Sequence, residues 1–90
     1  MLVLPDQLTH ATAPACCRML AQALRSDPGR EAVADASGLR QFDSSALAVL
    51  LEARREALAL GKTFSVNQLP PRLRELATLY GVAELLPTAS

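Results

Sequence analysis

The sequence predicts an α/β layered fold in which helices cover a sheet of parallel neighbouring strands. Short apolar segments of strand length alternate along the chain with longer segments of helical periodicity. Turns rich in glycine, proline and serine separate these segments. Successive strand–helix–strand units imply parallel neighbours joined by right-handed crossovers. Because 90 residues suffice for one small core, we expect a single domain over residues 1–90.

The first third of the chain predicts two short strands and a helix. Residues 2–4 form an apolar strand that Pro5 ends, and residues 7–9 form a second short strand. A helix is expected over residues 13–25, with Thr12 as the N-cap and Pro14 in the first turn. Helical spacing assigns four of its residues to the core: Cys16, Leu20, Ala23 and Leu24.

The middle of the chain predicts a buried strand and the longest helix. Residues 31–36 include a continuous apolar run, which is typical of a strand covered on both faces. Residues 45–60 form the clearest helix, and Gly61 suits its C-terminal end. Its apolar stripe is expected to comprise Ala46, Leu47, Leu50, Leu51, Ala57, Leu58 and Leu60.

The last third predicts a strand, a helix and a short apolar tail. The strand covers residues 63–66, and Pro70 and Pro71 begin the helix, which Gly81 ends. The core positions of this helix follow helical spacing: Leu73, Leu76, Ala77 and Tyr80. Residues 83–86 are expected to pack onto the sheet.

Composition excludes several classes of function. Nine basic and nine acidic residues give zero net charge, which argues against a nucleic-acid partner. No apolar run is long enough for direct membrane insertion, and residues 1–6 lack the features of a signal peptide, so we expect a cytoplasmic protein. The adjacent Cys16 and Cys17 and the single His10 suit no metal-site spacing, so we expect no metal and no cofactor.

The junction between the strand at residues 31–36 and the long helix is the candidate functional region. Asp43 and Ser44 are both residue types that cap helix N-termini, and in one interpretation they only cap. In the other, a hydroxyl beside the partly positive helix terminus serves for docking or phosphorylation. The carboxyl ends of parallel strands, where this loop lies, are the usual position of sites in open α/β sheets.

The stretch over residues 33–55 resembles the centre of a STAS domain. Asp35 resembles the family's strand-end aspartate, Phe42 the apolar residue before the motif, and Asp43 and Ser44 its aspartate and phosphorylatable hydroxyl. Gly61 and residues 73–81 fit the second half of the family pattern. The resemblance covers nearly the whole chain and implies a STAS-like fold, with a mixed, mostly parallel sheet covered by about three helices.

Among STAS domains, the chain resembles most the small cytoplasmic subunit of Mla phospholipid transport systems. That resemblance implies no enzymatic activity and a peripheral location at the inner membrane, through binding to the ATPase subunit of an ABC transporter with its permease. The transporter maintains outer-membrane lipid asymmetry. The implied partner-binding residues lie in the loop and the first turns of the long helix: Arg40, Gln41, Phe42, Asp43, Ser44, Ser45 and Ala48.

Other interpretations of Ser44 stay open. The resemblance also extends to anti-sigma-factor antagonists, for which the partner is a serine kinase of the anti-sigma type and Ser44 is the phosphorylation site. Ala46 stands where the family usually has glycine, and we expect it to leave a kinase less room beside Ser44. An enzyme with Asp43 and Ser44 as a nucleophile pair lacks an evident base. In the last alternative, both residues only cap the helix.

Overall fold

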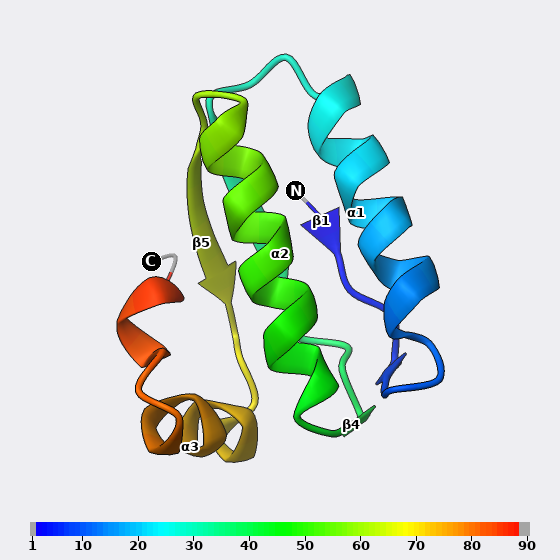
Figure 1. Ribbon diagram of the computed structural model, residues 1–90, viewed down its shortest axis with the longest axis vertical. Helices are drawn as coiled ribbons and strands as arrows, with labels where there is room; N and C mark the ends of the chain where they lie inside the picture. Colours follow the sequence, from blue (N-terminus) through cyan, green and yellow to red (C-terminus); the bar gives the residue numbers. More distant parts are fainter. Residues whose placement is uncertain (1, 89–90) are drawn as a thin grey trace.

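The computed structural model describes residues 2–88 and has the α/β architecture that the sequence predicts (Figure 1). Helices and strands alternate in the expected order, with one additional short strand, β4. In chain order the elements are β1 (Leu2–Val3), β2 (Gln7–Leu8), α1 (Ala13–Ser26), β3 (Glu31–Asp35), β4 (Gln41–Phe42), α2 (Ser45–Ala59), β5 (Thr63–Asn67), α3 (Pro71–Leu79) and the 3₁₀ helix η1 (Ala83–Leu85).

The described strands form two sheets, and every strand pair in them is parallel. The main sheet has the order β1-β3-β5, with Leu2 opposite Ala34 and Ala34 opposite Val66. A second, two-stranded ladder joins β2 to β4 and pairs Leu8 with Phe42. Both strands of this small ladder follow strands of the main sheet along the chain, so β4 lies near the sheet's carboxyl edge, beside the start of α2 (Figure 1).

Helices α1 and α2 lie side by side over one face of the main sheet (Figure 1). On β3, Ala32 and Ala34 are buried, whereas the intervening Val33 is only half-buried. The prediction that this strand is covered on both faces was therefore wrong. Its apolar run has small inward-facing alanines, so the helices approach the sheet closely, and the alternate residues face the open side.

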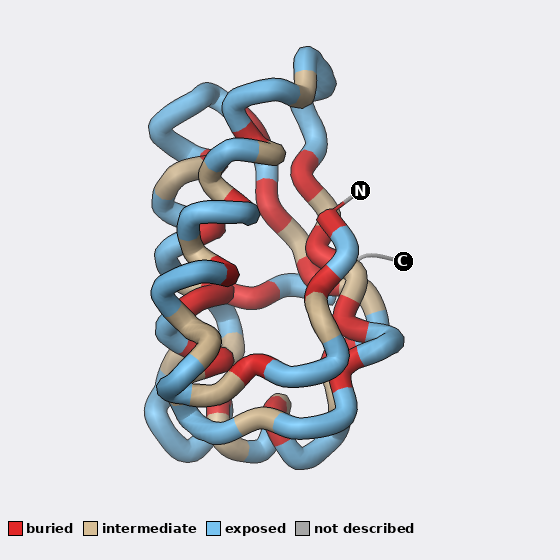
Figure 2. Tube along the Cα trace, turned by 90° about the vertical axis from the view of Figure 1, so that its right-hand side faces the viewer, coloured by how far each residue is buried: buried red, intermediate tan, exposed pale blue. Residues whose placement is uncertain are grey.

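The core lies between the sheet and the inner sides of the helices (Figure 2). On α1, the predicted core residues Cys16, Leu20 and Leu24 are buried, and Ala23 packs against them at the margin. Thr12 occupies the predicted N-cap position, but its side chain makes no capping bond; its hydroxyl oxygen instead accepts the Thr9 N–H at 2.9 Å.

Helix α2 buries a narrower stripe than the sequence predicts. Its buried residues are alanines, leucines and one valine: Ala46, Leu47, Val49, Leu50, Ala53 and Ala57. Leu51 is half-buried, and Leu58 and Leu60 are exposed, so their assignment to the core was wrong. The covered stripe narrows toward the helix's C-terminal end, where Ala57 alone faces the core. Gly61 ends the helix with a φ of 75°.

Helix α3 and the segment after it cover the end of the sheet. Leu73 and Ala77 are buried, but Tyr80 follows the last helical residue and is 57 % exposed, so its core assignment was also wrong. The predicted packing of the tail is confirmed. Leu86 is fully buried, the Val66 N–H donates to the Pro87 carbonyl at 2.8 Å, and Thr88 forms an isolated parallel bridge with Val66.

The loop between α1 and β3 is held by a buried lysine. Lys62 is 8 % exposed, and its ammonium group donates to the carbonyl of Asp27 at 2.6 Å and to the carbonyl of Gly29. The lysine thus satisfies two backbone acceptors that the turn leaves unpaired. No helix within residues 2–88 has the length and apolarity needed to cross a membrane.

Candidate partner-binding site

The loop from β3 to α2 is fixed at both of its ends. At its start, the Asp35 carboxylate accepts the Ser37 N–H at 3.0 Å, and Leu39 is buried in the core. At its end, the backbone N–H groups of Arg40 and Gln41 donate to the Asp6 carbonyl at 2.8 and 2.9 Å. The loop that carries the predicted site is therefore a preformed surface tied to the N-terminal segment.

Asp43 caps helix α2. One carboxylate oxygen accepts the Ser45 N–H at 2.8 Å, and the other accepts the His10 N–H at 3.0 Å. The Asp43 carbonyl accepts the Ala46 N–H at 3.0 Å and so begins the helical ladder. Hydrogen bonds from His10 and then Ser45 hold the pKa of the Asp43 carboxyl below its usual value.

The Ser44 side chain takes no part in this capping. Its side chain is exposed, its backbone is helical (φ −62°, ψ −17°), and its hydroxyl makes no hydrogen bond with any residue in the range 2–88. Only half of the capping interpretation therefore holds, because the Asp43 carboxylate accepts the Ser45 N–H, whereas the Ser44 hydroxyl accepts none of the first-turn amides. The serine hydroxyl is left free to meet an incoming group.

The substitution of alanine for the family's glycine does not crowd Ser44. Ala46 is fully buried in the core cluster, so its methyl group packs inward and not into the solvent around the serine. The expectation that Ala46 leaves a kinase less room beside Ser44 was wrong. The reason is helical geometry, because two residues of rotation in a helix amount to about 200°, which places Ser44 and Ala46 on nearly opposite sides of the axis.

The seven predicted site residues lie together along one continuous segment. Arg40 is exposed beside β4, Gln41 and Phe42 form β4, and Asp43 and Ser44 follow at the helix start. Ser45 and Ala48 lie on the first turns of α2, where they line a hollow of about 400 Å³ against His10 and Ala13 of the N-terminal segment.

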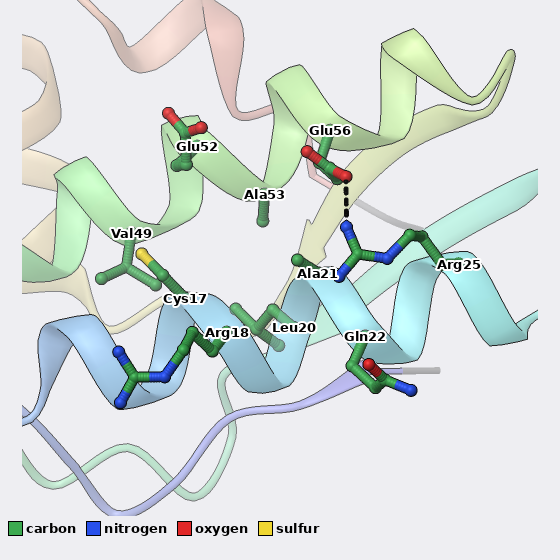
Figure 3. A pocket seen from close by; sticks show the side chains of 10 residues that line it. All are labelled: Cys17, Arg18, Leu20, Ala21, Gln22, Arg25, Val49, Glu52, Ala53 and Glu56. Atoms are coloured by element: carbon green, nitrogen blue, oxygen red, sulfur yellow. Dashed lines mark hydrogen bonds and ion pairs between the residues drawn. The ribbon is translucent and has the colours of Figure 1, made fainter.

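This hollow continues as a shallow groove between α1 and α2, which the sequence analysis missed. The next part of the groove encloses about 360 Å³ and shares Cys17, Val49 and Glu52 with the hollow (Figure 3). The Cys17 side chain points from α1 toward α2, and the Arg25–Glu56 ion pair crosses the far end at 3.1 Å (Figure 3). Burial raises the pKa of the Cys17 thiol, and Glu52 raises it further, so the thiol stays protonated at neutral pH.

Within residues 2–88, no three histidine, cysteine or acidic side chains approach closely enough to hold a metal ion. His10 donates its backbone N–H to the Asp43 carboxylate, and its imidazole makes no hydrogen bond with Ser44. The exposed hydroxyl, the helix terminus and the small residues Ser45 and Ala48 instead form a surface on which a protein segment can lie.

Comparison with models of known families shows to which family the chain belongs. A family model described as "Mlab, STAS domain" matches residues 1–87. The chain belongs to the STAS family. The solved structures similar to this STAS domain include the anti-sigma-factor antagonist SpoIIAA in its unphosphorylated form, with 18% identity, a TM-score of 0.74, and coverage of 98% of this chain and 76% of that one. A comparison with curated proteins gave no match.

A second similar structure is an anti-sigma-factor antagonist (STAS) domain protein from Planctomyces limnophilus. It is 17% identical, has a TM-score of 0.79, and is covered over 79% of its length by 98% of this chain. At these identities the two structures establish the STAS fold.

Proposed function

We propose that this STAS domain is a non-catalytic subunit that binds the ATPase of a phospholipid ABC transporter, together with its permease, through the surface around Ser44. The observation that supports this proposal most directly is the free Ser44 hydroxyl at an exposed, rigidly held helix start. The match to the family model described as "Mlab, STAS domain" supports the transporter class. The transporter would hold the subunit at the inner membrane and maintain outer-membrane lipid asymmetry.

The mechanism is linkage between binding and the conformation of the ATPase. A rigid surface that contacts one arrangement of the ATPase better than others shifts the population toward that arrangement. The loop is suited to this role because Asp6, His10 and Asp43 fix its geometry before any partner arrives. Small side chains at Ser45 and Ala48 let a partner helix approach the first turns of α2 closely.

The direct test is binding of purified ATPase to two variants. Ser44→Arg places a long cation at the centre of the surface, so we expect its affinity to fall by roughly tenfold or more. Ser26→Arg is the matched control, because Ser26 is also exposed but lies at the other end of the molecule, at the end of α1 (Figure 1). Equal affinities for the two variants would place the interface elsewhere.

Regulation by phosphorylation is the alternative function, and the same free hydroxyl favours it. In that case the partner is a serine kinase of the anti-sigma type, and a phosphate on Ser44 adds a charge of roughly −1.5 to −2 to the surface. Tagged protein purified from its native host separates the two functions by mass spectrometry. Recovery of an ABC ATPase with its permease supports the transporter function, whereas a serine kinase and phosphorylated Ser44 support the alternative.

A further inference from the structure

A second concave surface lies beside the proposed interface, between β4 and α3. It is a groove of about 870 Å³, lined by Arg40 and Phe42 on one wall and by residues of α3 on the other: Arg72, Glu75, Leu76 and Leu79. Both elements lie at the same end of the molecule (Figure 1). The groove shares Arg40, Gln41 and Phe42 with the predicted site, and Phe42 directly precedes Asp43 in the chain.

Both walls of the groove are held in place without a ligand. The β2–β4 ladder fixes the first wall, together with the two hydrogen bonds that the backbone N–H groups of Arg40 and Gln41 donate to the Asp6 carbonyl. Leu73 and Ala77, both fully buried, anchor the opposite side of α3 in the core. A groove whose walls are already fixed in their backbone binds a partner at a lower ordering cost to this protein.

The groove combines an apolar floor with local positive charge. Phe42 and Leu76 pack against the core, while Leu79 is 75 % exposed, the largest exposed fraction among the large apolar side chains of residues 2–88. The guanidinium groups of Arg40 and Arg72 make no ion pair or hydrogen bond to any described residue, and Glu75 is the single acidic group in the lining.

We propose that this groove binds an acidic segment of the partner that carries leucine or similar apolar side chains on one face. Apolar side chains would cover Leu79 and Phe42, and flanking carboxylates would pair with Arg40 and Arg72 in bidentate fashion. The concave shape and the presence of Glu75 favour a protein segment over a flat anionic membrane. The inference rests on the proposed function, since it assigns the segment to the partner that contacts Ser44.

The first experiment measures the affinity of the purified ATPase for charge-reversed variants. Arg40→Glu with Arg72→Glu should weaken binding roughly tenfold or more and reduce its salt dependence. Arg30→Glu with Arg55→Glu makes the same change in net charge at exposed arginines outside the groove, and should stay within about twofold of wild type. If Ser44→Arg abolishes binding but the groove variant binds as the control does, the proposed function stands and this inference fails. If wild type does not bind the ATPase, the proposed function fails first.

The second experiment tests the groove without the ATPase. A short synthetic helical peptide with leucine on one face and glutamate on the other is titrated into isotope-labelled protein, followed by NMR. We expect amide shifts that cluster at Phe42, Leu76 and Leu79 and vanish in the Arg40→Glu, Arg72→Glu variant. A matched peptide with lysine in place of glutamate should leave these signals unmoved.

Vesicles of phosphatidylglycerol supply the contrasting outcome. Cosedimentation that depends on Arg40 and Arg72, without a response to the acidic peptide, would assign the groove to anionic lipid and overturn the proposal. Peptide shifts scattered over the α1–α2 groove, or none at all, would overturn it as well.

Discussion

The carboxylate of Asp43 accepts a hydrogen bond from the backbone N–H of His10 at 3.0 Å, which joins residues 33 positions apart. The same carboxylate accepts the Ser45 N–H, so one side chain connects the N-terminal segment to the start of α2. This contact separates the roles of two neighbouring residues, because Asp43 supports the structure while the hydroxyl of Ser44 remains unused.

Removal of the Ser44 hydroxyl should leave the stability of the isolated domain unchanged. Ser44→Ala deletes a group that makes no hydrogen bond within the described chain, so the free energy of unfolding should change by less than about 0.5 kcal/mol. Urea denaturation checks this. A loss above about 1 kcal/mol would mean that the hydroxyl caps the helix after all.

Removal of the Asp43 carboxylate should lower stability and leave two amides unpaired. Asp43→Ala exposes the N–H groups of His10 and Ser45 to water without their acceptor, so we expect a clear fall in melting temperature. Glu52→Ala provides the control, since the one ion pair of Glu52 with the described residues is a long surface pair with Arg55 at 3.7 Å. Equal melting temperatures for the two variants would contradict the capping role.

Acid should destabilise the domain through three aspartates with the same local geometry. Asp27, Asp35 and Asp43 each accept the N–H two residues further on, and each has a lowered pKa. Because the folded pKa lies below the unfolded one, this stabilisation is complete above the unfolded value of about 3.9 and is lost as pH falls through the folded pKa. Melting temperature against pH should fall steeply there, and less steeply for Asp43→Asn.

The narrowed core stripe of α2 predicts a sharp contrast between two leucines. Leu50 is fully buried, so Leu50→Ala should cost about 2–5 kcal/mol in unfolding free energy. Leu58 is exposed on the same helix, and Leu58→Ala should change it by less than about 0.5 kcal/mol. Similar losses in urea denaturation would restore the wider stripe that the sequence predicts.

The buried ammonium of Lys62 should contribute more than any exposed cation near it. Lys62→Met keeps the apolar stem but leaves the carbonyls of Asp27 and Gly29 unpaired, at a cost of about 1–3 kcal/mol. Arg30→Met in the same region removes an exposed cation whose guanidinium forms no ion pair in the described chain, and should be nearly neutral. Thermal denaturation of both variants, side by side, measures the difference.

The periodic parts of this fold follow from sequence, whereas contacts between distant segments do not. Cys16, Leu20 and Leu24 repeat at helical spacing, so the buried side of α1 was predictable. Strand β4 has only two residues, which is too short for a periodic signal. Its partner β2 lies beyond an entire helix in the chain, so the pairing could not be predicted either. Leu58 fits the apolar pattern of α2, and only the extent of the covering elements shows that it is exposed.

The candidate site, too, was predictable from the sequence only in part. Asp43 and Ser44 were identifiable as helix-start residues, but which of them caps depends on the backbone conformation and on the position of His10. The β4–α3 groove was invisible, since Arg40 and Arg72 are brought together only by the topology of the sheet. The roles of residues that are neighbours in the sequence could therefore be predicted, whereas the surfaces formed by distant elements could not.

The all-parallel pairing of the described strands also determines how the chain can fold. Every ladder, such as Leu2 with Ala34 or Ala34 with Val66, joins strands separated by a whole helix and its loops. The described strands form no hairpin that could serve as an early nucleus, so we expect the helices to form and collapse before the central strand gains either neighbour. The N-terminal strand contributes two residues at the sheet's edge. We expect it to dock last and, in hydrogen exchange of the native protein, to open first.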